Sequence, residues 1–253
     1  MSAAAGIGGR APEPEVVFHD AECGGYTADL ALWRRLADAC SGPILDLGAG
    51  SGRVALPLAR AGHRVIAVER DTVLAIELGR RAAAAGVEIG IVEADARELP
   101  ALSEPIALAL APMQFMQLLD RADRRAVLAR VAAALASGGL FAAALLDESV
   151  PLSSGEPDPL PDLREVEGWV HSSLPLDVRV DGGTIEILRL RSVVSPAGEL
   201  SERRHEIRLH RLGVAELAAE AERCGLRAID TEPIGQTEDH VASVAVLMER
   251  TDG

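Results

Sequence analysis

The stretch ILDLGAGSGR, residues 44–53, decides how this chain folds. A short apolar run contains Asp46 and leads into glycines at every second position: Gly48, Gly50 and Gly52. The residues that follow carry apolar side chains at helical spacing. We therefore predict a strand, a tight turn and a helix, which together form the first unit of a nucleotide-binding α/β sheet.

The glycine spacing separates this turn from two other nucleotide loops. A dinucleotide fingerprint needs a small residue at its last position, whereas here Gly52 comes one residue early and the bulky Arg53 takes that position. A phosphate-binding loop needs a lysine, and the chain contains none. An NAD(P)-dependent oxidoreductase stays the alternative enzyme, because it also uses an acidic residue after its second strand.

Two further strands also lead into acidic residues. The run 64–68 is followed by Glu69 and Arg70, and the run 87–92 is followed by Asp95 and Ala96. A carboxylate at the end of the second strand can accept hydrogen bonds from two ribose hydroxyls. The competing interpretation is an ordinary negative charge at the start of the next helix.

The G-x-G-x-G turn preceded by Asp46 resembles motif I of the class I S-adenosylmethionine (SAM) dependent methyltransferases. The resemblance covers residues 26–147 well and residues 213–250 more loosely. It implies a Rossmann-like, doubly wound α/β sheet of seven strands with an antiparallel last strand. An antiparallel β region is inserted into that sheet.

The resemblance also implies the residues that bind SAM. The glycine turn approaches the methionine part, Glu69 holds the ribose, an acid after the third strand meets the adenine, and a tyrosine covers the carboxylate end. The cofactor-binding set is Tyr26, Asp46, Gly48, Ala49, Gly50, Gly52, Glu69, Arg70, Asp95, Ala96 and Ala111. Gln117 stands where the family often has histidine, and Ser137 replaces a proline before Gly138. These departures leave open a non-catalytic SAM-binding protein.

The chain divides into a tail and one methyltransferase domain. The expected segments are a disordered tail at 1–15 and a domain at 16–253, made of an N-terminal lid helix at 16–42, a SAM-binding half at 43–148, a loop with inserted strands at 149–211 and a closing helix with strands at 212–253. Two or three extra antiparallel strands are expected within 165–173, 176–180, 184–194 and 200–211. They would cap the acceptor site, or pair two subunits in a homodimer.

Methyl transfer from a sulfonium needs an in-line approach and, for some acceptors, a group that takes a proton. It requires no metal, and S-adenosylhomocysteine is the other product. His171 and His205 are our candidate catalytic bases: alternation places His205 on the inward side of its strand and His171 on the same face as Trp169. His240 we interpret as structural. The substrate-binding candidates are Phe18, Trp33, Gln114, Phe115 and Trp169.

The composition of the chain limits the classes of partner that we expect. A net charge of −14 disfavours nucleic acid, so a small molecule is the expected acceptor. No apolar run approaches a membrane span, and three unclustered cysteines indicate a reducing cytoplasm. Arginine pairs such as Arg124–Arg125 and Arg203–Arg204 we interpret as solvated faces.

Overall fold

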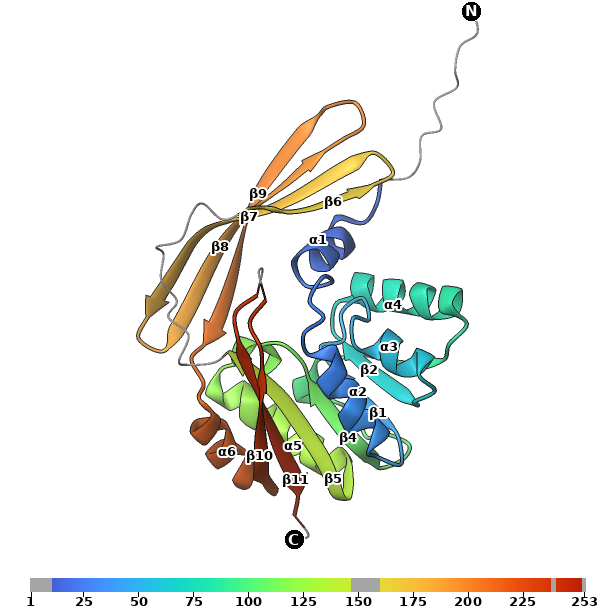
Figure 1. Ribbon diagram of the computed structural model, residues 1–253, viewed down its shortest axis with the longest axis vertical. Coiled ribbons are helices and arrows are strands. Elements are labelled where there is room, and N and C mark those ends of the chain that lie inside the picture. The colour runs from blue at the N-terminus through green and yellow to red at the C-terminus, as the bar shows by residue number, and fades with distance from the viewer. Residues whose placement is uncertain (1–10, 147–159, 238–239, 252–253) are drawn as a thin grey trace, which may run out of the picture.

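The computed structural model describes residues 11–146, 160–237 and 240–251. They form a seven-stranded sheet of order β10-β11-β5-β4-β1-β2-β3 and a four-stranded sheet of order β6-β7-β8-β9 (Figure 1). In the larger sheet, β11 is antiparallel to both of its neighbours, β10 and β5. This confirms the expected fold: a doubly wound α/β sheet with one antiparallel strand near its edge and an added β region.

The larger sheet follows the expected order of elements. Its strands are β1 (Ile44–Leu47), β2 (Val65–Glu69), β3 (Ile89–Glu93), β4 (Ile106–Ala111), β5 (Leu135–Leu146), β10 (Leu226–Ile234) and β11 (Ser243–Arg250). Its helices are α2 (Leu30–Asp38), α3 (Ala55–Arg60), α4 (Thr72–Ala85), α5 (Arg121–Ala134) and α6 (Val214–Glu222), with the short turns η1 (Ala96–Glu98) and η2 (Phe115–Leu118).

Two apolar clusters hold these layers together. One packs α2, α3 and α4 on one face of the sheet, and the other packs α5 and α6 on the opposite face (Figure 1). All of β1 is buried, because a central parallel strand is covered on both faces. Local signals set the helix ends: the Asp71 side chain accepts hydrogen bonds from the amides of Val73 and Leu74, and Gly86 ends α4 with a φ of 66°.

The smaller sheet corrects the predicted strand count. It contains four strands: β6 (Asp162–Val166), β7 (Trp169–Asp181), β8 (Thr184–Val194) and β9 (Leu200–His210). The predicted strand at 165–173 is divided by a two-residue turn, in which Glu167 and Gly168 have φ values of 52° and 81°. The predicted strand at 176–180 is the continuation of β7.

Helix α1 (Pro14–Glu22) lies between the two sheets (Figure 1). It contacts β6 and β7 on one side and α4 on the other. The expected tail at 1–15 therefore ends too late, since Pro14 and Glu15 already form the first turn of this helix. Residues 1–10 and most of the expected loop at 149–162 lie outside the described residues.

Candidate functional site: the carboxyl ends of the strands

The glycine turn after β1 requires glycine at three positions. Gly48, Gly50 and Gly52 have φ values of 65°, 57° and 101°, a region that side chains disfavour. A Cβ on Gly48 would lie 2.6 Å from the Phe115 ring, and one on Gly50 would lie 2.2 Å from His19 Nε2. The missing side chains therefore let Phe115 and His19 approach the main chain of the turn closely.

The carboxylate of Glu69 is fixed beside this turn. Its Oε2 accepts a hydrogen bond of 2.8 Å from the Gly50 amide, and its Oε1 accepts one of 2.8 Å from the Asp71 amide. The side chain is buried, at the end of β2. Because a carboxylate offers about four acceptor positions, each oxygen can still accept a hydroxyl. The structure thus brings Glu69 and the glycine turn together across nineteen residues of sequence.

Asp46 lies buried beneath the turn. Neither carboxyl oxygen has a partner in hydrogen-bond geometry among the described residues. Burial raises the pKa of this carboxyl to about 7, while Arg53 and the Ala55 amide oppose the rise. Arg53 itself is held by Asp29, at 2.6 Å and 2.8 Å. Asp46 is therefore a desolvated carboxyl close to the Arg53 guanidinium.

Asp95 and Arg70 meet where β2 and β3 end. The Arg97 side chain lowers the pKa of Asp95, whose carboxylate also accepts a hydrogen bond of 2.9 Å from the Arg97 amide. A guanidinium nitrogen of Arg70 lies 4.0 Å from Asp95 Oδ2. Ala96 is buried just behind them. Three of the residues proposed for the nucleoside end thus lie together.

The carboxyl end of β4 carries the next candidates. Ala111 is the last residue of the strand and is fully buried. Gln114 follows, and its Nε2 lies 3.5 Å from Ser243 Oγ at the start of β11. Gln117 is buried, and its Oε1 accepts a hydrogen bond of 2.7 Å from the Leu146 amide at the end of β5. Sequence reasoning did not identify Ser243, because β10 and β11 come last in the chain.

Tyr26 is buried close to this edge. Its hydroxyl has no partner in hydrogen-bond geometry among the described residues, although Ser243 is near enough to lower its pKa, which burial raises. The ring centroid lies 4.7 Å from that of His240, and the Arg53 guanidinium carbon lies 5.2 Å from the same ring. His240 was expected to be structural only, yet it meets a predicted site residue.

Helix α1 covers the glycine turn. Ser51 Oγ donates a hydrogen bond of 2.7 Å to Asp20 and lies 3.2 Å from His19 Nδ1. Burial alone would raise the pKa of Asp20, but the hydrogen bonds from Arg81 and Ser51 outweigh it and lower that pKa. Burial also lowers the pKa of His19. Of this helix the sequence singled out only Phe18, since nothing in the motif refers to an upstream helix.

The two proposed bases lie on the face of the smaller sheet that is turned toward α1. His171 is 1% exposed, its ring nitrogens have no hydrogen-bond partner among the described residues, and its ring centroid lies 5.4 Å from that of Phe18. His205 is half-buried opposite Arg189. Burial lowers the pKa of both imidazoles. Trp169 begins the same strand as His171 and is half-buried.

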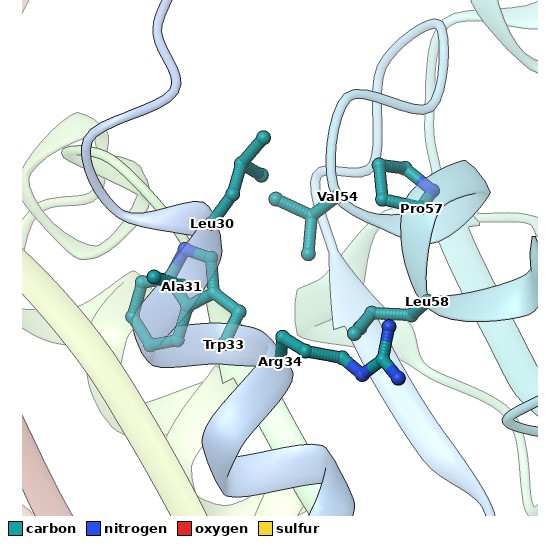
Figure 2. A pocket seen from close by; sticks show the side chains of 7 residues that line it. All are labelled: Leu30, Ala31, Trp33, Arg34, Val54, Pro57 and Leu58. Atoms are coloured by element: carbon teal, nitrogen blue, oxygen red, sulfur yellow. The ribbon is translucent and has the colours of Figure 1, made fainter. Parts of the chain in front are cut away.

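Trp33 lies elsewhere. It has no exposed surface, and its indole Nε1 donates a hydrogen bond of 2.7 Å to Asp29. It lines a small apolar hollow between α2 and α3 (Figure 2). That hollow includes none of the other candidate residues, so the structure does not bring Trp33 to Gln114 and Phe115.

The described ranges of the chain hold no cluster of three or more histidine, cysteine or acidic side chains placed to bind a metal ion. Their helices all fall short of the length and apolar character that crossing a bilayer demands.

Comparison with known proteins agrees with this geometry. Residues 44–139 match the family model for a methyltransferase domain. The chain resembles Rv1403c, an uncharacterised protein of Mycobacterium tuberculosis, with 47% identity over 57 residues. That match covers 22% of this chain and spans only about a fifth (21%) of the relative.

Solved structures share the whole fold. The sugar N-methyltransferase KedS8 from a Streptoalloteichus species superposes with a TM-score of 0.73, at 15% identity, covering 100% of this chain and 98% of its own. SAM-bound CalS10, an amino pentose methyltransferase from Micromonospora echinaspora, gives a TM-score of 0.66 at 21% identity, covering 93% and 97%.

The family match, the sheet order and the glycine turn agree in placing a methyltransferase-like domain at residues 44–139.

Proposed function

We propose that this enzyme transfers the methyl group of SAM to a small-molecule acceptor by in-line displacement. The observation that supports this most directly is the Glu69 carboxylate, tied by the Gly50 amide to the edge of the glycine turn. A ribose held there would place the rest of the donor along that turn.

The described residues fit such a donor. Each Glu69 oxygen keeps an acceptor position for one ribose hydroxyl. Asp95 and Ala96, beyond the neighbouring strand, are proposed for the adenine, and the Ala111 carbonyl for the methionine ammonium. The sulfonium supplies an already activated methyl group, so the protein's contribution is to hold donor and acceptor in line.

The net charge of the chain and the names of two similar structures both favour a small acceptor. The chain carries a net charge of −14, which repels the phosphate backbone of nucleic acids. KedS8 and CalS10 are named as enzymes that methylate sugars. Both considerations favour a metabolite over a macromolecule.

Pairing of two chains through the smaller sheet is part of this proposal. The face of that sheet away from α1 exposes Leu163, Val170 and Leu200 by 64%, 38% and 60%. Apolar side chains grouped in this way favour a contact with a second copy. Sedimentation analysis would show a monomer if this part is wrong.

The test of the proposed activity has two parts. Calorimetry with SAM, S-adenosylhomocysteine and NAD should give heat with the first two only. Tritium-labelled SAM incubated with fractionated metabolites, and separately with RNA and DNA, should label a small molecule. Binding of NAD without SAM would instead support the oxidoreductase.

A further inference from the structure

The order of strands gives the donor a direction across the sheet. The adenine candidates follow β3, the ribose acid ends β2, and the glycine turn follows β1. Because β4 is next in the sheet and β5 and β11 come after it, the sulfonium end points toward β4. The acceptor must then approach over the ends of β4, β5 and β11.

Four side chains meet at that place. Gln114 follows β4, and Ser243 begins β11, where it pairs with Leu146 at the end of β5. The Tyr26 hydroxyl lies near Ser243, in a side chain that is only 4% exposed. His240 stacks against the Tyr26 ring, at 4.7 Å and 35°. The buried Tyr26 hydroxyl and the neighbouring Ser243 give this place polar groups that can bind a polar ligand.

Thr237 contacts His240 on the Nδ1 side of the imidazole ring. Its amide donates a hydrogen bond of 3.0 Å to Thr237 Oγ1, and its Nδ1 lies 3.5 Å from the same oxygen. Nε2 is the ring nitrogen directed away from that contact. Burial raises the pKa of the Asp162 carboxyl, and Arg189 and His240 both oppose the rise, so the ring also lies within reach of β6.

We propose that Gln114, Ser243, Tyr26 and His240 form the acceptor end of the site, where His240 Nε2 takes the proton of an acceptor amine or hydroxyl. This inference rests on the proposed function. The acceptor's proton passes to Nε2, and its nitrogen or oxygen lone pair forms a bond to the methyl carbon. The carbon–sulfur bond breaks with its electron pair left on sulfur, which gives S-adenosylhomocysteine.

The placement also explains why neither earlier candidate is needed as the base. His171 is sealed against Phe18 beneath α1, and His205 faces Arg189 on the smaller sheet. His240 is instead on the hairpin that extends from the larger sheet, beside a residue proposed to bind the donor.

A donor analogue tests this without knowledge of the acceptor. Sinefungin carries an amino group where the sulfonium methyl stands, whereas S-adenosylhomocysteine carries nothing there. We expect the protein to prefer sinefungin, because its ammonium would donate to the cluster. The variant His240→Phe keeps a ring against Tyr26 but removes both nitrogens, and should lower that preference about tenfold.

The controls separate this inference from the proposed function. His210→Phe, on the outward side of β9, should leave the preference unchanged. The affinity of His240→Phe for S-adenosylhomocysteine should stay within about twofold of that of the unmodified protein, which would also show that the variant is folded. His240→Ala is the second variant.

Two results would overturn the inference alone. They are equal affinity of the unmodified protein for the two nucleosides, and a preference that survives in both His240 variants. Failure of the unmodified protein to bind either nucleoside would overturn the proposed function itself.

Discussion

The two sheets of this protein are held in place by different forces. The seven-stranded sheet is covered on both faces by apolar helices, and the glycine turn and Glu69 lie at its edge. The four-stranded sheet meets α1 through ion pairs that surround the buried Phe18 and His171 rings. Glu22 lies 2.7 Å from Arg191, which approaches Glu15 at 3.3 Å, and Arg203 also pairs with Glu15. The larger sheet is thus fixed by apolar packing, whereas ion pairs contribute strongly to the attachment of the smaller sheet.

Helix α1 joins the two regions. Its Glu22 accepts hydrogen bonds from the smaller sheet, while its Asp20 accepts one from Ser51 in the glycine turn. A change in the position of α1 should therefore affect both the smaller sheet and the glycine turn.

The largest effect is expected from Arg191→Ala. Arg191 is 6% exposed and its guanidinium lies over Phe18, with 5.0 Å between its carbon and the ring centroid. Removing it leaves the buried Glu22 carboxylate without its main partner, so the free energy of unfolding should fall by about 3–5 kcal/mol. Urea unfolding followed by circular dichroism measures this.

Arg208→Ala is the matched control on the next strand. Arg208 is exposed and forms an exposed ion pair with Glu186, so its loss should cost less than about 1 kcal/mol. Similar losses for the two variants would show that charge does not hold the cap to α1.

The contrast between the two sheets also explains which features could be predicted from the sequence and which could not. The order of strands and the meeting of Glu69 with the glycine turn follow from local motifs on consecutive β–α units. The docking of α1 does not, because Glu22 and Arg191 are 169 residues apart and no local pattern joins them. Two arginines interpreted as solvated are in fact engaged: Arg203 lies over Phe18, and Arg124 is buried against Glu220.

A second prediction compares two glycines with nearly the same backbone. Gly50 and Gly182 have φ values of 57° and 53°, but a Cβ on Gly50 would meet His19 and one on Gly182 would meet nothing. Gly182→Ala should cost about 1–2 kcal/mol of unfolding free energy, from backbone strain alone. Gly50→Ala should cost more, because α1 must also shift. Equal costs would mean that His19 does not rest on the turn.

Acidification should change the stability of the molecule by a smaller amount, and the change should have opposite signs in the two regions. The pKa values of His19, His171 and His205 are lowered from 6.5, and those of Asp20 and Glu22 from 3.8 and 4.5. Groups with depressed pKa values contribute stability above the unfolded value and lose it as the pH falls through the folded value. The attachment of α1 should therefore weaken below pH 6.5, and further below about pH 4.5.

Asp46 behaves in the opposite way, since burial raises its pKa to about 7. Its contribution is present at low pH and is lost as the pH rises through about 7. Hydrogen exchange at pH 7 and pH 5 should thus show protection falling in α1 while β1 keeps its protection. Parallel loss in α1 and β1 would contradict the division into two regions.

The most direct measurement is the affinity for SAM of Glu69→Ala beside that of Glu93→Ala. These two glutamates are paired across β2 and β3, but only Glu69 is bound by the glycine turn. Losing charge-assisted hydrogen bonds to the ribose should weaken SAM binding about 10- to 100-fold in Glu69→Ala, with Glu93→Ala close to the unmodified protein. A folded Glu69→Ala protein that binds SAM as tightly as Glu93→Ala does would contradict the account.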